Sequence, residues 1–143
     1  MKKLTALCLM LLFCFTMIFA ATEEKDEIAE LQKRRDTLTY GLESEITGLI
    51  DTLIKEEDST LSDEIYKVFE TAKNTNIKDK IILYYKTNKD PRLSQWAIEV
   101  LADPFDEEKS TINQLINYCG ALKIKAAAPY LTNIGRNALL TEK

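Results

Sequence analysis

Histidine is absent from the 143 residues of the chain, and glycine and cysteine are scarce. Without histidine, the chain lacks the usual general base of Ser-His and Cys-His sites and the commonest metal ligand. The four glycines, Gly41, Gly48, Gly120 and Gly135, are isolated, which excludes a glycine-rich phosphate loop. We therefore expect a protein that is not an enzyme, binds no cofactor and takes no small-molecule substrate.

The three cysteines are distributed unevenly. Cys8 and Cys14 lie in an apolar N-terminal run, so an exported mature chain would keep only Cys119. A single cysteine cannot form an internal disulfide. It is also too few for a structural zinc site, which needs four cysteine or histidine ligands. Cys119 lies in line with an apolar helix face, which favours a buried, inert thiol over a reactive thiol or one that pairs between molecules.

The N-terminus has the order of a secretory signal peptide. Lys2 and Lys3 precede an apolar run of 16 residues, 4–19, and Ala20 and Ala21 follow it. The run is shorter than the roughly twenty residues that a membrane-spanning helix needs. We expect a signal peptide at 1–21, cleaved after Ala20 or Ala21, and a mature protein in the bacterial periplasm.

Two other interpretations of the N-terminus stay open. An uncleaved segment would tether the same domain to the inner membrane, facing the periplasm. Lipid attachment to Cys8 or Cys14 is the second, although both lie inside the apolar run and not at its end after small residues.

The mature chain is acidic. The 19 Lys and Arg include Lys2 and Lys3, so removal of the signal leaves 17 basic against 23 acidic residues, a net charge of −6. Nucleic acids and anionic lipids are bound by clustered basic residues, so neither is an expected partner. A membrane contact is expected only if the N-terminal segment is uncleaved.

Carboxylates are plentiful, at Glu43 and Glu45, at 56–58 and at 103–108. Because they fall in polar loops or on polar helix faces, we interpret them as solvated. A glycosidase would need an acid pair across a cleft, with one pKa raised. A calcium site at Asp103, Asp106, Glu107 and Glu108 is another alternative, but the segment lacks the spacing and central glycine of a calcium loop.

Apolar residues recur at helical spacing along the whole mature chain, and no segment alternates as a strand would. The spacing predicts an all-α protein with a long helix over 24–55, broken near Tyr40-Gly41. Residues 22–41 would form a charged helical arm. Further helices are expected at 61–73, 77–85, 91–101, from 110 or 111 to 120, and from about 125 onward.

Several residues are candidates for helix caps. Thr60 with Asp63 resembles a capping box, and Asn76 is positioned to cap the helix at 77. Asp90 followed by Pro91 is a strong helix start. Ser110 or Thr111 would cap the next helix, and the first turn of the last helix must hold Pro129.

The predicted helices pair into three units, 42–73, 76–102 and 110–135, whose starts lie about 34 residues apart. Such a period is typical of an α-solenoid, in which stacked hairpins bury what one hairpin cannot. We expect a short solenoid domain at 42–143 of about three antiparallel helix pairs.

Residues 88–101, which contain Asp90-Pro91-Arg92 and Ala97, resemble bacterial HEAT repeats. Residues 113–134 are similar to the other half of such repeats, and 32–41 resemble the leader of exported spirochaete HEAT-repeat proteins. The resemblance implies a scaffold that binds a protein partner and carries no active site.

Aromatic side chains are the candidates for contact with that partner. Trp96 shares a helical face with Leu93 and Val100, which predicts core packing. Tyr84 and Tyr85 are adjacent, so one of them should be exposed, and we select Tyr66 and Tyr85 as candidate binding residues. The alternative function is a structural envelope protein that associates with itself through the arm or through an open C-terminal end.

Overall fold

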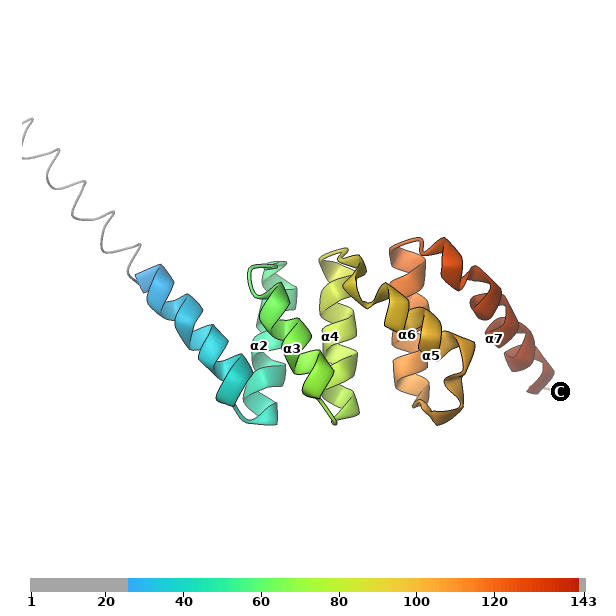
Figure 1. Ribbon diagram of the computed structural model, residues 1–143, viewed down its shortest axis with the longest axis horizontal. Coiled ribbons are helices and arrows are strands. Elements are labelled where there is room, and N and C mark those ends of the chain that lie inside the picture. Colours follow the sequence, from blue (N-terminus) through green and yellow to red (C-terminus); the bar gives the residue numbers. More distant parts are fainter. Residues whose placement is uncertain (1–25, 142–143) are drawn as a thin grey trace, which may run out of the picture. The chain divides into compact units, whose positions relative to one another are not determined.

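The structure is a computed structural model that describes residues 26–141, with side chains to residue 136 (Figure 1). Within these residues the chain is helical and contains no strand, which confirms the all-α class. The chain divides into two compact units, 1–36 and 37–143. The expected signal peptide, its cleavage site and the cysteines at 8 and 14 lie outside the described residues. No helix within 26–141 has both the length and the apolar character needed to cross a membrane.

The first unit contributes the start of a helix that runs from residue 26 to residue 40. Side chains four residues apart support it: Gln32 Nε2 donates to Asp36 Oδ1 at 2.8 Å, and Arg34 Nη2 donates to Glu30 Oε1 at 2.9 Å. Pairs of this kind contribute about 0.2–0.5 kcal/mol each to a helix. The described part of the expected charged arm is therefore helical.

The predicted break at Tyr40-Gly41 is confirmed, and its cause is local. The helix ends before Gly41, and α2 (Glu43–Glu56) begins two residues later. The Gly41 N–H donates to the Thr37 carbonyl at 2.9 Å, and a Cβ at Gly41 would lie 2.5 Å from that oxygen. Only glycine permits this approach. The Glu45 carboxylate then accepts a hydrogen bond from the Leu42 N–H at 2.7 Å and caps α2.

The second unit contains three helical hairpins in its described part. The first pairs α2 with α3 (Ser62–Thr71), and the second pairs α4 (Thr75–Thr87) with the short helix η1 (Pro91–Leu93) and α5 (Ser94–Ala102). The third pairs α6 (Lys109–Ala121) with η3 (Lys125–Ala127) and α7 (Ala128–Thr141), and η2 (Pro104–Asp106) lies between α5 and α6. In Figure 1, α2, α4 and α6 lie side by side, and α4 packs along both of its neighbours. Helices α3 and α5 form a second row that packs on α4 and α6 respectively.

The three hairpins close with the same turn. In each turn a non-glycine residue adopts the left-handed conformation: Glu57 at φ 53°, Lys89 at φ 53° and Lys123 at φ 54°. The N–H of the next residue donates to the carbonyl five positions earlier; these bonds join Asp58 to Leu53 at 3.0 Å, Asp90 to Tyr85 at 2.9 Å and Ile124 to Cys119 at 3.0 Å. This is the Schellman arrangement that ends many helices. The turns repeat after 32 and then 34 residues, which gives the described hairpins a common plan.

The core is centred on α4. Ile77, Ile81, Ile82, Tyr84 and Tyr85 are all buried, the last four completely. The expectation that Tyr84 or Tyr85 is exposed is wrong. A helix with one apolar face would expose one of two adjacent residues, but α4 is covered by α2 and α6 within its row and by α3 and η1 from the other row.

The helix starts are partly as expected. Asp90 does cap the helix that begins at Pro91, accepting a hydrogen bond from the Arg92 N–H at 2.9 Å, although the first turn is a 3₁₀ helix. Pro129 lies in the first turn of α7, as predicted. The cap of α4 is Asn74, not Asn76, because the Asn74 side chain accepts a bond from the Asn76 N–H.

Two other predicted caps are wrong. Asp58, not Thr60, organises the start of the second predicted helix: its carboxylate accepts a bond from the Thr60 N–H at 2.8 Å, and α3 begins with no side-chain cap. Helix α6 begins after Glu108. Thr111 is buried inside α6 and donates to Asp79 Oδ1 of α4 at 2.7 Å, so it connects two hairpins and caps neither.

Candidate functional site

An aromatic strip joins α3 to α5. It consists of Tyr66 and Phe69 on α3 and Trp96 on α5. The rings of Phe69 and Trp96 meet edge to face, with centroids 4.8 Å apart and planes at 80°, and Tyr66 stacks beside Phe69 at 6.2 Å. Phe69 is 7% exposed, whereas Tyr66 and Trp96 are half-buried. The strip therefore presents two aromatic side chains over a buried third.

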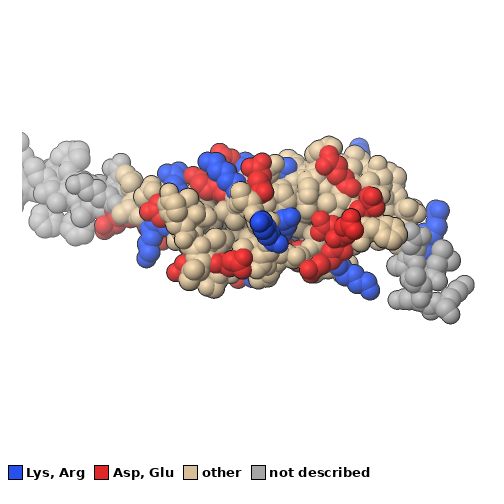
Figure 2. All heavy atoms as spheres, turned by 60° about the horizontal axis from the view of Figure 1, so that its bottom comes forward, with Lys and Arg blue, Asp and Glu red and all other residues tan. Residues whose placement is uncertain are grey.

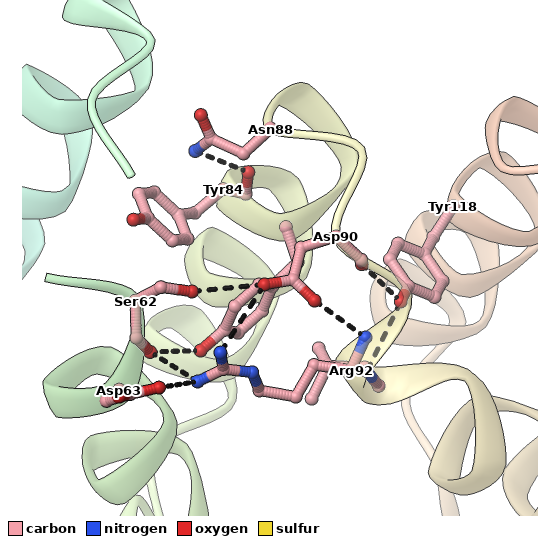
Figure 3. A network of polar contacts seen from close by, with 9 residues as sticks. Ser62, Asp63, Tyr84, Asn88, Asp90, Arg92 and Tyr118 are labelled. Carbon is pink, nitrogen blue, oxygen red and sulfur yellow. Dashed lines mark hydrogen bonds and ion pairs between the residues drawn. The ribbon is translucent and has the colours of Figure 1, made fainter. Parts of the chain in front are cut away.

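Arg92 borders this strip and connects the second hairpin to the first (Figure 3). Its Nη1 donates to Asp63 Oδ1 at 2.7 Å and to the Ser62 carbonyl at 3.1 Å. The guanidinium carbon lies 5.7 Å from the ring centroid of Tyr66 and 5.7 Å from that of Tyr85. The same cation thus binds the Ser62 carbonyl and the Asp63 carboxylate at the start of α3 and lies over the face of the Tyr66 ring.

Asp90 fixes Arg92 from the other side. Its Oδ2 lies 3.7 Å from Arg92 Nη2 and accepts a hydrogen bond from Ser62 Oγ at 3.1 Å. Its Oδ1 caps η1, as described above. The start of α3 and the start of η1 are in this way held by one carboxylate, which positions Arg92 beside the strip.

The electrostatics of the network keep Arg92 a cation. Burial alone would lower the pKa of Arg92, but the hydrogen bond with Asp63 and the nearby Tyr85 and Asp90 raise it above its ordinary value. Burial raises the pKa of the Tyr85 hydroxyl, and a hydrogen bond with the Ser62 side chain partly opposes that change. The Tyr85 hydroxyl donates to the Ser62 carbonyl at 2.7 Å. Tyr85 is therefore a neutral donor inside the network.

The two candidate binding residues have different positions. Tyr66 reaches the surface in the strip, as a binding residue must. Tyr85 is completely buried, with its hydroxyl bound to the Ser62 carbonyl, so it presents no surface to a partner. Trp96, expected in the core, is only half-buried, with its ring edge to face against Phe69.

Sequence reasoning missed two features. Arg92 was recognised only as part of a repeat pattern, because its partners Asp63 and Ser62 lie 29 and 30 residues earlier in the sequence. Phe105, in the loop between α5 and α6, was not selected, yet it is 95% exposed. An apolar residue inside the acidic segment 103–108 was the available signal.

The acidic residues and Cys119 are the remaining candidates from the sequence. Across residues 26–136, no three acidic or cysteine side chains converge to hold a metal ion. Cys119 is 1% exposed and burial raises its thiol pKa, which confirms the prediction of a buried thiol. A depression on α7 is lined by Pro129, Tyr130, Thr132, Asn133 and Arg136, without a carboxylate.

Comparison with known proteins gave no relatives: no protein-family model, curated protein or solved structure matches the chain.

Proposed function

We propose that this chain is an exported, non-catalytic scaffold that binds a protein partner and is built on HEAT-like repeats. The hairpin plan supports the repeat, because three turns of the same geometry recur after 32 and 34 residues. A row of stacked hairpins gives a rigid surface, so little conformational entropy is lost when a partner binds.

The observation that carries the proposal is the aromatic strip of Tyr66, Phe69 and Trp96. It crosses from one hairpin to the next, and its outer rings are half-exposed beside the cation of Arg92. Tyrosine, tryptophan and arginine are the residue types most enriched at the energetic centres of protein interfaces. Of these residues, Arg92 is held in place before binding by its contacts with Asp63 and Asp90.

Affinity capture from cell-envelope extracts tests this proposal. Tyr66→Ser should lower recovery of a specific envelope protein at least about fivefold, as loss of an interface aromatic does. Lys67→Ser is the matched control, because Lys67 is the next residue of α3 and is exposed. Equal recovery with both variants would contradict a role for the strip. Reading the N-terminus of the captured chain by mass spectrometry tests export, since a start near Ala21 or Thr22 is expected.

A structural envelope protein that associates with itself is the second candidate. It is favoured by large apolar side chains exposed in and next to the 26–40 helix: Ile28 at 61%, Tyr40 at 83% and Leu42 at 70%. Sedimentation velocity of the purified mature chain separates the two functions. A stable homo-oligomer would favour self-association, and a monomer would favour the scaffold.

A further inference from the structure

Phe105 has the greatest exposure of the large apolar side chains in the described part of the chain, at 95%. It lies in the middle of η2 (Pro104–Asp106), and the turn is closed by the Glu107 N–H, which donates to the Pro104 carbonyl at 3.3 Å. Proline fixes its own φ and reduces the freedom of the turn. The Phe105 side chain therefore extends into solvent from a closed turn.

The loop that carries Phe105 is longer than a connection between these hairpins needs to be. Three residues, 72–74, join α3 to α4, whereas six residues, 103–108, join α5 to α6. The two loops connect equivalent elements of neighbouring hairpins. The additional residues of the second loop are thus not needed to connect the helices, and they place an aromatic ring on the surface.

The residues next to Phe105 in the sequence are mostly acidic. Asp103, Asp106, Glu107 and Glu108 flank it in the sequence, and Lys109 is the adjoining basic residue. Among the described residues, no ion pair involves Asp103, Asp106 or Glu107, and Glu108 accepts a hydrogen bond from Thr75 Oγ1 at 3.2 Å. Figure 2 shows acidic side chains gathered over the C-terminal half of the described residues. The carboxylates of Asp103, Asp106 and Glu107 can therefore face a cationic partner.

We propose that the Phe105 loop, residues 103–108, docks into an apolar pocket of a protein partner whose rim is basic. The ring supplies the anchor, and the carboxylates supply charge complementarity that steers association. An anionic lipid surface would repel these carboxylates. A second copy of the chain carries the same net negative charge, −4 over the whole sequence, and would be repelled at a distance. The inference rests on the proposed binding function, but it uses a surface distinct from the aromatic strip.

Photo-crosslinking in the native host cells tests the inference with the full chain. A photoreactive phenylalanine analogue, p-benzoylphenylalanine, replaces Phe105, and the same probe at the exposed Lys55 serves as control. The expected product joins residue 105 to an apolar peptide of another protein that also contains lysine or arginine. Its yield should fall at least about fivefold when Asp103, Asp106 and Glu107 are changed to Asn, Asn and Gln, because charge complementarity is lost.

Several outcomes overturn the inference. They are a product with the chain itself, a product with lipid, a yield equal to that of the Lys55 control, and a yield that the three charge changes leave unaltered. Thermal unfolding of the Phe105 variant should match that of the unchanged chain, because the Phe105 side chain is 95% exposed. The probe at Tyr66 separates the two hypotheses. A partner captured from position 66 but not from 105 refutes only the loop, whereas capture from neither refutes the loop and the scaffold together.

Discussion

Tyr84 and Tyr118 occupy the same place in successive hairpins, five residues before the left-handed Lys89 and Lys123, but only Tyr118 has partners for its hydroxyl. The Tyr118 hydroxyl donates to the Asp90 carbonyl at 2.8 Å and accepts a bond from the Leu93 N–H at 3.2 Å. The Tyr84 hydroxyl is buried and, among the described residues, has no hydrogen-bond partner. The equivalent position in two successive hairpins therefore carries a hydrogen-bonded hydroxyl in one hairpin and an unpaired hydroxyl in the other.

Removing these two hydroxyls should have different consequences for stability. Tyr118→Phe leaves a buried N–H and a partly buried carbonyl without their partner, which should lower the free energy of unfolding by ~1–3 kcal/mol. Tyr84→Phe removes a polar atom that has no hydrogen-bond partner. This variant should change the free energy of unfolding by less than ~0.5 kcal/mol or raise it. Urea unfolding of the mature chain, followed by far-ultraviolet circular dichroism, measures both. An equal loss in the two variants would show that Tyr84 has a partner in solution.

The buried tyrosines also predict how stability depends on pH. Burial, followed by the nearby Asp58 carboxylate, raises the pKa of Tyr84 to about 12, and burial raises the pKa of Tyr118 as well. A group whose pKa is higher in the folded state contributes stability that is complete below its unfolded pKa, about 10 for tyrosine. That stability is lost as the pH rises from about 10 through the folded pKa.

We therefore expect alkaline unfolding to begin near pH ~10, and little change between about pH 6 and 8, because the chain has no histidine. In an alkaline titration, the tyrosinate absorbance of the native chain should rise at a higher pH than that of the urea-denatured chain. If the native and denatured curves coincide, the buried hydroxyls ionise freely and the expectation is wrong.

The sequence predicted those features of the fold, a helix start and a helix break, that depend on one or two neighbouring residues. The start at Asp90-Pro91 and the break at Gly41 were predictable because a cap, a fixed φ and a missing side chain act within a few residues. The burial of both Tyr84 and Tyr85 was not predictable. It depends on four elements that surround α4, and no spacing within α4 encodes their positions.

The candidate site was predictable only in part, for the same reason. Tyr66 was selected by its residue type, but Arg92 acquires its role from Ser62 and Asp63, about thirty residues earlier. The aromatic strip likewise depends on the meeting of α3 and α5, which brings Phe69 and Trp96 together. Contacts between hairpins leave no periodic signal in a single sequence.

The two acids of the Arg92 network should contribute unequally to stability. Asp90 caps η1 and accepts a bond from Ser62, so Asp90→Ala should cost about 1–2 kcal/mol. The Asp63 side chain is 82% exposed, so solvent screens its ion pair with Arg92 and Asp63→Ala should cost less than ~0.5 kcal/mol. Thermal unfolding midpoints of the two variants, in low and in high salt, measure the difference. A larger loss for Asp63→Ala would mean that its ion pair, and not the Asp90 cap, joins the hairpins.

Two glycines provide the sharpest comparison of backbone requirements. Gly48 lies inside α2, and no neighbouring atom lies within 4 Å of the place that a Cβ would take. Because alanine has a higher helix propensity than glycine, Gly48→Ala should raise the free energy of unfolding by about 0.5–1 kcal/mol. Gly41→Ala should lower it, because the new Cβ would lie 2.5 Å from the Thr37 carbonyl oxygen and the turn must open. Opening would also break the 2.9 Å bond from the Gly41 N–H to that oxygen. Urea unfolding of both variants beside the unchanged chain measures the two signs. Stabilisation by Gly41→Ala would mean that the 26–40 helix continues into α2 in solution, without the break.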